Sequence, residues 1–153
     1  MISIGEDRLK HILAVARRCY EIAKYRGFNE TFCRKMFVIG FLHDIGYEFS
    51  ESNSEHSDVG YELLKDIISD EKILLAIKKH GKVVEEQSKE LNILNCADMT
   101  VDSKGNVVDV LGRLKDIRDR YNEHPEVYLT AIGVAEMSNL IGVNSLRKDT
   151  FGG

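Results

Sequence analysis

Two adjacent residues, His43 and Asp44, follow the apolar stretch FCRKMFVIGFL at 32–42. An imidazole beside a carboxylate is costly to bury at the end of a core helix unless a partner compensates both groups. A divalent cation does so, because imidazole nitrogens and carboxylate oxygens are common metal ligands in proteins. The pair therefore indicates a metal site, on condition that other parts of the chain supply further ligands.

Further candidate ligands occur in four other segments of the chain. Each lies at a predicted helix end or on the inward face of a predicted helix, and they are His11, His56, His80 and Asp98. One such residue alone is more often structural, as a cap, a surface histidine or a buried hydrogen-bond acceptor. Asp98 is the most costly of them, because it interrupts an otherwise apolar helical stripe. Taken together with His43 and Asp44, they favour a shared metal site.

The spacing of apolar residues predicts the helices that must position these side chains. Apolar positions recur at helical intervals in segments at about 6–25, 30–45, 56–68, 71–80, 88–101, 107–121 and 125–140. The segment 30–45 is apolar nearly all round, which predicts the central helix of a bundle. No alternating strand pattern of useful length occurs. The predicted fold class is all-α, a bundle of about six to seven helices.

Length and composition limit the classes of protein. The 153 residues predict a single domain spanning 1–153, with a polar tail at 144–153 that we expect to be flexible. A net charge of -4 provides no basic surface for long nucleic acid. No stretch resembles a membrane span or a signal peptide. Cys19, Cys33 and Cys96 form no CxxC pair and indicate reduced thiols in a cytoplasmic protein.

The order of the candidate ligands resembles the HD superfamily of metal-dependent phosphohydrolases. A histidine near the N-terminus is followed by an adjacent His-Asp pair and, farther on, by an aspartate. The matching segments are RLKHILAVA, GFLHDIGY, EHSDVGYELL, AIKKHG and LNCADMTVD, which together extend from about Arg8 to Asp102. The set looks most like the small bacterial HD proteins that include hydrolases of symmetrical dinucleoside polyphosphates.

This resemblance implies the roles of the individual residues. The core metal ligands would be His11, His43, Asp44 and Asp98, with His43 and Asp44 as the catalytic pair. His56 and His80 match the additional histidines of the family members that bind two metal ions, and Asp44 would bridge the two ions. A set of imidazoles and carboxylates without thiolate suits divalent transition metals, with Fe or Mn favoured and Co, Ni or Zn as alternatives.

The resemblance also implies an activity, the hydrolysis of a phosphoester or phosphoanhydride by a metal-activated hydroxide. The expected partner is a small phosphorylated substrate such as a nucleotide or a dinucleoside polyphosphate. Candidate side chains for contact with it are Arg8, Lys79, Lys82, Asp102 and Arg113. The apolar faces of the late helices are compatible with a closed bundle and with a homodimer.

Departures from the family pattern narrow this prediction. Tyr47 stands where the cyclic-dinucleotide phosphodiesterases carry the lysine of HDIGK, and their GYP signature is absent. The same tyrosine replaces the glutamate expected in the bacterial 5′-nucleotidase branch. Two other functions remain open: a nucleotide-binding or signalling module without hydrolysis, and a diiron oxygenase.

Overall fold

The structure, a computed structural model, describes residues 5–48 and 56–142; the tail at 144–153 lies outside these residues. Every helix or strand element in the described part is a helix, which confirms the predicted all-α fold class. In chain order, the elements are α1 (Glu6–Tyr25), α2 (Glu30–Leu42), the 3-10 helix η1 (Ile45–Glu48), α3 (His56–Leu64), α4 (Glu71–Lys79), α5 (Lys89–Asp98), α6 (Val110–Arg120) and α7 (Pro125–Met137).

Several helices begin at a side chain that caps their first turn. At the start of α4, the carboxylate of Asp70 accepts hydrogen bonds from the backbone N–H groups of Lys72 and Ile73. Asn29, Ser88 and Asp109 cap α2, α5 and α6 in the same manner. The first N–H groups of a helix have no partner within the helix, so these short polar side chains stabilise the start of each one.

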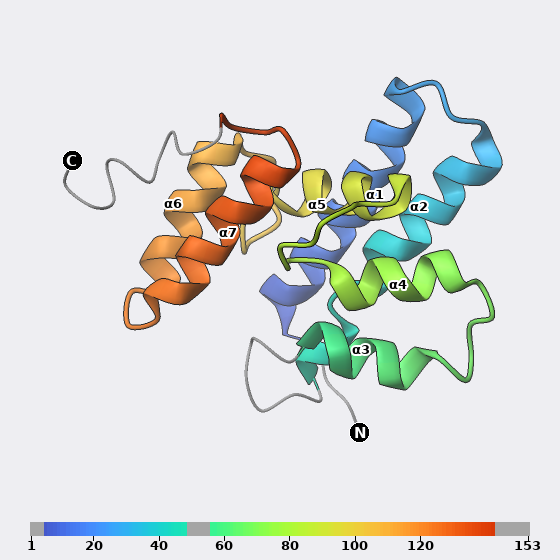
Figure 1. The fold of residues 1–153 in the computed structure, drawn as a ribbon, viewed down its shortest axis with the longest axis horizontal. Coiled ribbons are helices and arrows are strands. Elements are labelled where there is room, and N and C mark those ends of the chain that lie inside the picture. Colours follow the sequence, from blue (N-terminus) through green and yellow to red (C-terminus); the bar gives the residue numbers. More distant parts are fainter. Residues whose placement is uncertain (1–4, 49–55, 143–153) are drawn as a thin grey trace.

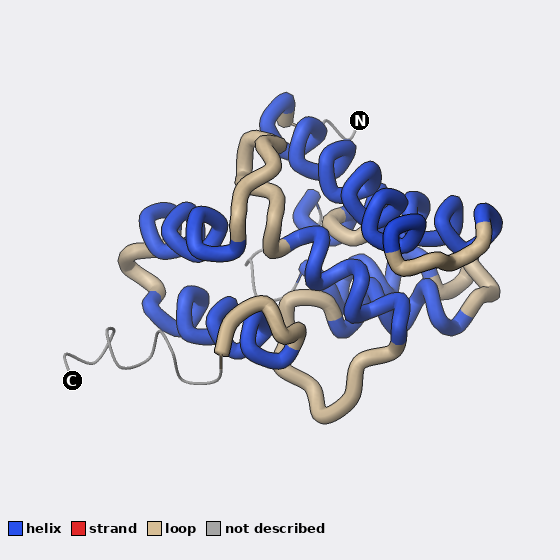
Figure 2. The backbone as a smooth tube through the Cα atoms, turned by 90° about the horizontal axis from the view of Figure 1, so that it is seen from above, coloured by secondary structure: helices blue, strands red, loops and turns tan. Residues whose placement is uncertain are grey.

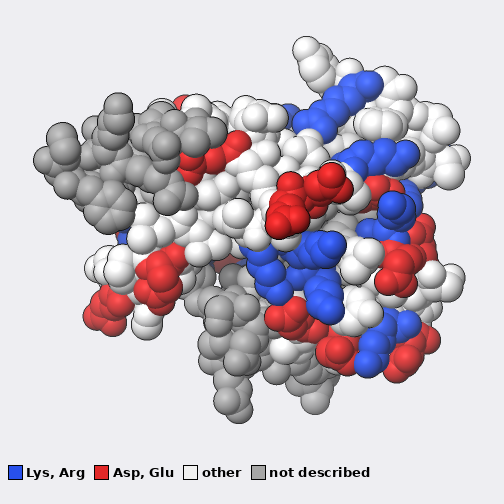
Figure 3. All heavy atoms as spheres, viewed as in Figure 1, with Lys and Arg blue, Asp and Glu red and all other residues white. Residues whose placement is uncertain are grey.

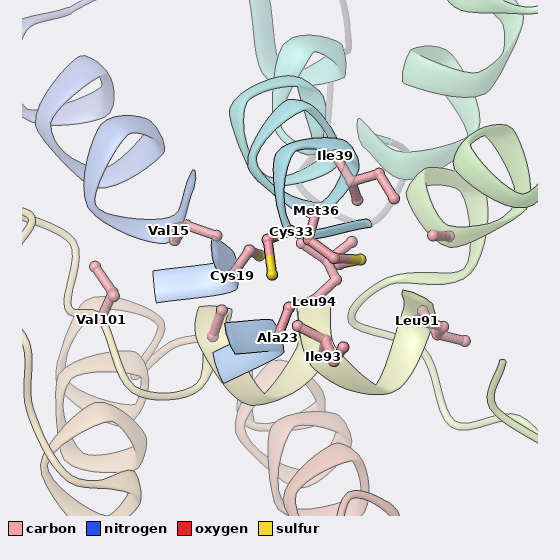
Figure 4. Packing of buried hydrophobic residues seen from close by; sticks show 12 residues of the cluster. Val15, Cys19, Ala23, Cys33, Met36, Ile39, Leu91, Ile93, Leu94 and Val101 are labelled. Atoms are coloured by element: carbon pink, nitrogen blue, oxygen red, sulfur yellow. The ribbon is translucent and has the colours of Figure 1, made fainter. Parts of the chain in front are cut away.

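The helix at the centre of the fold is α5. Its buried residues are Glu90, Leu91, Ile93, Leu94, Asn95, Cys96 and Ala97. They pack against α1 and α2, and Cys33, Met36 and Leu94 meet in this interior (Figure 4). The prediction that α2 is surrounded by other helices is wrong, because Val38 and Phe41 on its outer face are 44% and 43% exposed.

The helices α6 and α7 lie side by side at one end of the molecule (Figures 1 and 2). They have an apolar cluster of their own, which includes Leu114 and Ile132. At the other end, α3 and α4 pack through a smaller cluster that includes Leu64 and Leu74. Since α5 contacts α1, α4 and α7, it connects both helix pairs to the middle of the bundle.

Several helix ends differ from the sequence prediction. Four helices are shorter by three or four residues at their C-termini: α2 ends at Leu42 instead of 45, α3 at Leu64 instead of 68, α5 at Asp98 instead of 101, and α7 at Met137 instead of 140. After α5, the Thr100 hydroxyl donates to the Cys96 carbonyl, a side-chain bond that accompanies the end of the helix. The start of α6 moves from 107 to Val110, because Val107 pairs with Val101 in an isolated antiparallel bridge.

The surface carries charges of both signs. On the face shown in Figure 3, Lys and Arg side chains are interspersed with Asp and Glu side chains, and no large area of one sign forms among the described residues there. None of the helices in residues 5–48 and 56–142 is long and apolar enough to span a membrane. Cys19, Cys33 and Cys96 are buried and unpaired, as predicted.

Candidate metal centre

The six candidate ligands come together at one place in the fold, contributed by five helices. The contributions are His11 from α1, His43 and Asp44 directly after α2, His56 at the start of α3, His80 directly after α4, and Asp98 at the end of α5. All of them are buried except His56 and Asp98, which are partly exposed. Residues far apart in the sequence thus form one polar cluster inside the helical bundle.

Asp44 lies at the centre of this cluster. Its Oδ2 atom is 3.5 Å from Nε2 of His11 and 3.3 Å from Nε2 of His43. Its Oδ1 atom is 3.6 Å from Nε2 of His56 and 3.5 Å from Nε2 of His80. The two oxygens of a single carboxylate therefore face two different pairs of imidazoles.

Asp98 adds a second carboxylate to the first pair of imidazoles, His11 and His43. Its Oδ1 atom lies 3.0 Å from Nε2 of His11 and 3.6 Å from Nε2 of His43. In the second group, the Nε2 atoms of His56 and His80 are 2.9 Å apart. One group thus has two imidazoles and two carboxylates, and the other has two imidazoles and the shared carboxylate of Asp44.

Hydrogen bonds at Nδ1 hold three of the imidazoles in place. Nδ1 of His11 donates to the backbone carbonyl of Asp102 at 2.8 Å. His43 and His80 each donate to the carbonyl three residues earlier in the chain, at 2.5 Å. Because a carbonyl only accepts, the bonded Nδ1 carries the proton, and in the neutral ring Nε2 presents its lone pair to the carboxylates. Metal-binding histidines are commonly oriented by such a bond on the second nitrogen.

These atoms fit a divalent ion. Nε2 of His43 and Oδ1 of Asp98 are the buried side-chain polar atoms that have no hydrogen-bond partner in the described part of the chain. Ligand atoms bonded at about 2.1 Å to one ion lie about 3.0–3.4 Å from each other. The separations from the two carboxylates to His11 and His43 run from 3.0 to 3.6 Å, close to that range. A cation between the groups satisfies both unpaired atoms.

The contacts between imidazoles and carboxylates also shift the pKa values of these groups. Burial opposes protonation of His43, but the carboxylates of Asp44 and Asp98 outweigh it and raise the pKa of His43 to about 10. Burial also opposes ionisation of the two aspartates. Nevertheless, His43 holds the pKa of Asp44 well below its usual value, and His11 together with His43 does the same for Asp98. The cluster therefore favours positive charge between imidazoles and carboxylates.

Gly46 allows His56 to approach the other ligands. A Cβ atom at Gly46 would overlap the backbone carbonyl of His56 and would lie 2.7 Å from the backbone nitrogen of Gly60. Because glycine has no Cβ, η1 can pack directly against the start of α3. Gly46, two residues after Asp44, thus allows α3 to lie close to the cluster.

A cavity of about 660 Å³ opens onto the cluster. Three of the cations predicted to contact substrate line it, namely Arg8, Lys82 and Arg113. The Arg8 Nη1 atom lies 3.5 Å from Oδ2 of Asp44, and the Arg113 Nη2 atom lies 3.5 Å from Oδ1 of Asp98. Positive side chains therefore line the cavity beside the carboxylates, where an anionic ligand would meet them.

Another part of the cavity wall is apolar. It comes mainly from α6 and α7 and consists of Met99, Ile117, Tyr121, Val127, Ala131 and Val134. Sequence reasoning missed these residues as candidates for ligand contact. They follow the same helical spacing as core residues, so no sequence signal separates an apolar side chain that lines a cavity from one that packs in the core.

Two predicted substrate contacts lie elsewhere. Lys79 is exposed and does not line the cavity, because the next residue, His80, takes the inward position at the end of α4. The carboxylate of Asp102 accepts hydrogen bonds from two backbone N–H groups of the following turn. Only its backbone carbonyl reaches the cluster, at His11. Neither side chain lines the cavity, and their contact with substrate stays a prediction.

The fold and the cluster together define an α-helical protein whose histidines and aspartates fit a divalent metal ion. The family can be stated directly: the chain belongs to the HD domain family, whose sequence model matches residues 8–101. That segment contains all six candidate ligands. HD domains bind divalent metals, and members of the family are generally metal-dependent hydrolases.

Two curated relatives share part of their sequence with this chain. Ribonuclease Y 2 of Pediococcus pentosaceus is 28% identical over 131 residues, covering 82% of this chain and 25% of the relative. An uncharacterized protein of Methanocaldococcus jannaschii is 33% identical over 94 residues, covering 58% of this chain and 54% of the relative. The chain thus spans a quarter to about half of these relatives. No solved structure matches significantly. Neither name refers to dinucleoside polyphosphates, so that closer resemblance stays a prediction.

Proposed function

We propose that this protein is a metal-dependent phosphohydrolase that cleaves a phosphoester or phosphoanhydride of a nucleotide, a dinucleoside polyphosphate or another small phosphate. The observation that carries the proposal is the arrangement at Asp44, whose two oxygens face separate pairs of imidazoles at 3.3–3.6 Å. Such an arrangement suits two divalent ions that share one carboxylate, a design used for phosphoryl chemistry.

In this proposal, His11, His43 and Asp98 would hold one ion, His56 and His80 would hold the other, and Asp44 would be a ligand of both. Imidazole-rich sites without thiolate favour transition metals over Mg or Ca, and Fe or Mn is the first expectation, with Co, Ni and Zn as alternatives. When bound, such ions would supply a water molecule of lowered pKa and positive charge to neutralise phosphoryl oxygens.

The cations of the cavity hold the substrate in this scheme. Phosphoryl transfer depends mainly on positioning and on stabilisation of negative charge. Arg8 and Arg113 lie next to the two carboxylates, and Lys82 lines the same cavity. Their positive charges attract the phosphate to the cluster and hold it there, while His43 and Asp44 form the catalytic centre.

The apolar wall supports an organic substrate over an inorganic one. A cavity of about 660 Å³ with cations beside the cluster and apolar side chains from α6 and α7 accommodates both a phosphate and an apolar ring system. A nucleotide has this combination. On the face shown in Figure 3, basic and acidic side chains are interspersed, and the described residues there form no extended basic track of the kind that binds long nucleic acid. Because one relative is a ribonuclease by name, a short oligoribonucleotide belongs among the substrates to be tested.

The test is a turnover screen on the metal-stripped protein after reconstitution with each metal. The substrates are nucleoside mono-, di- and triphosphates, dinucleoside polyphosphates, a small aryl phosphate and the short oligoribonucleotide. We expect hydrolysis with Fe or Mn, its loss on chelation, and its loss in Asp44→Ala. The exposed His124 at the start of α7 provides the control variant His124→Ala, which should keep the activity of the wild type.

Three results would contradict the proposal. One is the absence of bound metal even after reconstitution with Fe and Mn. Another is nucleotide binding that raises the melting temperature without hydrolysis under any metal, which would assign a binding or signalling module. The third is oxygen consumption with an organophosphonate or polyol, which would assign an oxygenase.

A further inference from the structure

The connection between α5 and α6 is docked onto α1 next to His11. Within it, the Asp102 carbonyl accepts two hydrogen bonds, one from the Gly105 backbone N–H at 3.2 Å and one from Nδ1 of His11. The chain reverses direction at Gly105, whose φ is +86°. A Cβ at Gly105 would lie 2.7 Å from the backbone carbonyl oxygen of Lys10. The turn therefore lies directly against the α1 backbone at the residue that precedes His11.

One peptide group in this connection has partners on both sides. Its carbonyl, which belongs to Asp102, accepts the Nδ1–H of His11 at 2.8 Å. Its N–H, which belongs to Ser103, donates to Oδ2 of Asp116 on α6 at 3.1 Å. The Ser103 hydroxyl donates to the other oxygen of Asp116 at 3.2 Å. The chain of contacts thus runs from the imidazole through a single peptide group to a carboxylate.

Asp116 is itself fixed on the other side by Arg113. The Nη1 atom of Arg113 donates to Oδ2 of Asp116 at 3.0 Å, and its Nε atom donates to the Asp98 backbone carbonyl at 3.1 Å. The guanidinium is buried, so these bonds are shielded from water. Asp116 therefore has a defined position relative to the end of α5, where Asp98 lies.

We propose that Asp116 is a positioning residue for His11 and acts through the peptide group between Asp102 and Ser103. A carboxylate that accepts from a peptide N–H polarises that peptide and strengthens its carbonyl as an acceptor. The Asp102 carbonyl in turn orients the His11 ring, so that Nε2 is directed to Asp44 and Asp98. This inference rests on the proposed metal centre, in which His11 Nε2 is a ligand.

The inference concerns a part of the chain outside the family match. The HD model covers residues 8–101, whereas Ser103 and Asp116 lie beyond it. A carboxylate that only stabilises the turn would leave the His11 ring and its affinity for metal unaffected once the protein is folded. Outer partners of metal-binding histidines, by contrast, change metal affinity by about 10–100-fold. The two roles therefore differ in what they predict for metal binding.

The first readout is the Nδ1 proton of His11 in the metal-free full chain, observed by NMR after labelling of the histidines. In Asp116→Ala we expect this proton to exchange with water at least about tenfold faster than in the wild type. The reason is that the peptide group whose Asp102 carbonyl accepts the proton loses its hydrogen bond to the Asp116 carboxylate. The Nδ1 protons of His43 and His80 serve as internal controls, because their acceptors are the Gly40 and Ile77 carbonyls, which have no contact with Asp116. The matched variant is Asp119→Asn, an exposed carboxylate on the same helix.

The second readout is the affinity for Mn²⁺, measured by calorimetry on the metal-stripped protein. We expect the Mn²⁺ affinity of the ligand set that contains His11, His43 and Asp98 to fall about 10–100-fold in Asp116→Ala and to stay unchanged in Asp119→Asn. The isosteric Asp116→Asn keeps an acceptor but loses the charge, so an intermediate loss is expected. It also replaces the alanine variant if that variant does not fold.

The outcomes separate this inference from the proposed function. Unchanged exchange at His11, exchange that accelerates equally at all three histidines, or unchanged Mn²⁺ affinity would each overturn the role of Asp116. If the wild type binds no Mn²⁺ while the His11 proton still responds selectively to Asp116→Ala, the positioning of His11 stands and the proposed function fails.

Discussion

At the scale of single residues, the candidate metal centre depends most on Asp44. Each of its oxygens faces a different pair of imidazoles, whereas Asp98 faces only His11 and His43. Removal of Asp44 therefore withdraws a ligand from both groups at once. The buried imidazoles are also left without the carboxylate that compensates their positive charge.

The first prediction concerns the variants Asp44→Ala and His43→Ala. Both should lose metal-dependent hydrolysis, because each removes a buried ligand that no neighbouring side chain replaces. Turnover with excess Mn²⁺, together with the metal content of the purified protein, measures the effect. His124→Ala changes a histidine that is exposed at the start of α7 and should behave as the wild type. A wild-type rate in Asp44→Ala would show that hydrolysis occurs elsewhere.

The candidate ligands could be identified from the sequence, because buried imidazoles and carboxylates are rare and their order is that of a known family. The residues that orient them could not. The acceptor of His11 is a backbone carbonyl 91 positions away, and any residue has such a group. Asp116 is one of two carboxylates within the amphipathic helix α6, and only the fold shows which peptide group it contacts.

At the scale of elements, the contact between η1 and α3 decides whether His56 reaches the cluster. The prediction is that Gly46→Ala moves the start of α3 away, since the added Cβ would overlap the His56 carbonyl. We expect a loss of stability of about 1–3 kcal/mol and a loss of metal from the group formed by His56 and His80. Urea unfolding and metal titration measure the two effects.

Gly5→Ala is the matched control for this variant. Gly5 precedes α1, has an ordinary φ of −60°, and a Cβ there would meet nothing within 4 Å. Gly5 is the N-cap of α1, where alanine is less favourable than glycine, so its substitution should cost less than about 1 kcal/mol and leave the metal content unchanged. If Gly46→Ala keeps the stability and metal content of the control, the close packing of η1 on α3 does not position His56.

A third prediction concerns the cap of α4 and the effect of pH on stability. A hydrogen bond from Lys35 lowers the pKa of Asp70 from 3.8, against a smaller effect of burial. A carboxyl whose pKa is lower in the folded state stabilises that state at any pH above the pKa of the unfolded chain. This contribution is lost as the pH falls through the pKa of the folded state. Asp70→Asn keeps a capping oxygen but loses the ion pair, which at this exposed site is worth less than about 1 kcal/mol.

We therefore expect the stability difference between the wild type and Asp70→Asn to be constant near neutral pH and to narrow below about pH 4. Asp70→Ala also loses the cap and should cost about 1 kcal/mol more. Urea unfolding across this pH range provides the measurement. A difference that does not depend on pH would mean that the ion pair with Lys35 contributes nothing.

The helices could be predicted well from apolar spacing, and their ends less well. Side-chain caps such as Asn29 and Ser88 are visible in the sequence and stand at the observed starts. The late start of α6 depends on the pairing of Val101 with Val107, which is a contact within the fold. The exposure of α2 also escaped prediction, because a run of apolar residues shows only that burial is favourable and leaves open which neighbours cover it.

At the scale of the whole molecule, the cluster connects five helices, so a bound ion links elements that otherwise meet through apolar contacts. The fourth prediction is that metal stabilises the fold. At an ion concentration 100 times the dissociation constant, binding adds about 2.7 kcal/mol. For a chain of this length that corresponds to a rise in melting temperature of about 5–10 °C.

A melting curve with and without Mn²⁺ measures this effect, and a chelator should reverse it. Asp44→Ala should show little or no rise. An equal rise in Asp44→Ala and in the wild type would mean that the stabilising ion binds outside the cluster.

The most direct test of the central claim is the number of Mn²⁺ ions bound per chain, determined by titration of the metal-stripped protein. The shared position of Asp44 predicts two ions in the wild type, one in His80→Ala and none held tightly in Asp44→Ala. A wild-type protein that binds no ion, or an Asp44→Ala variant that still binds two, would contradict the account.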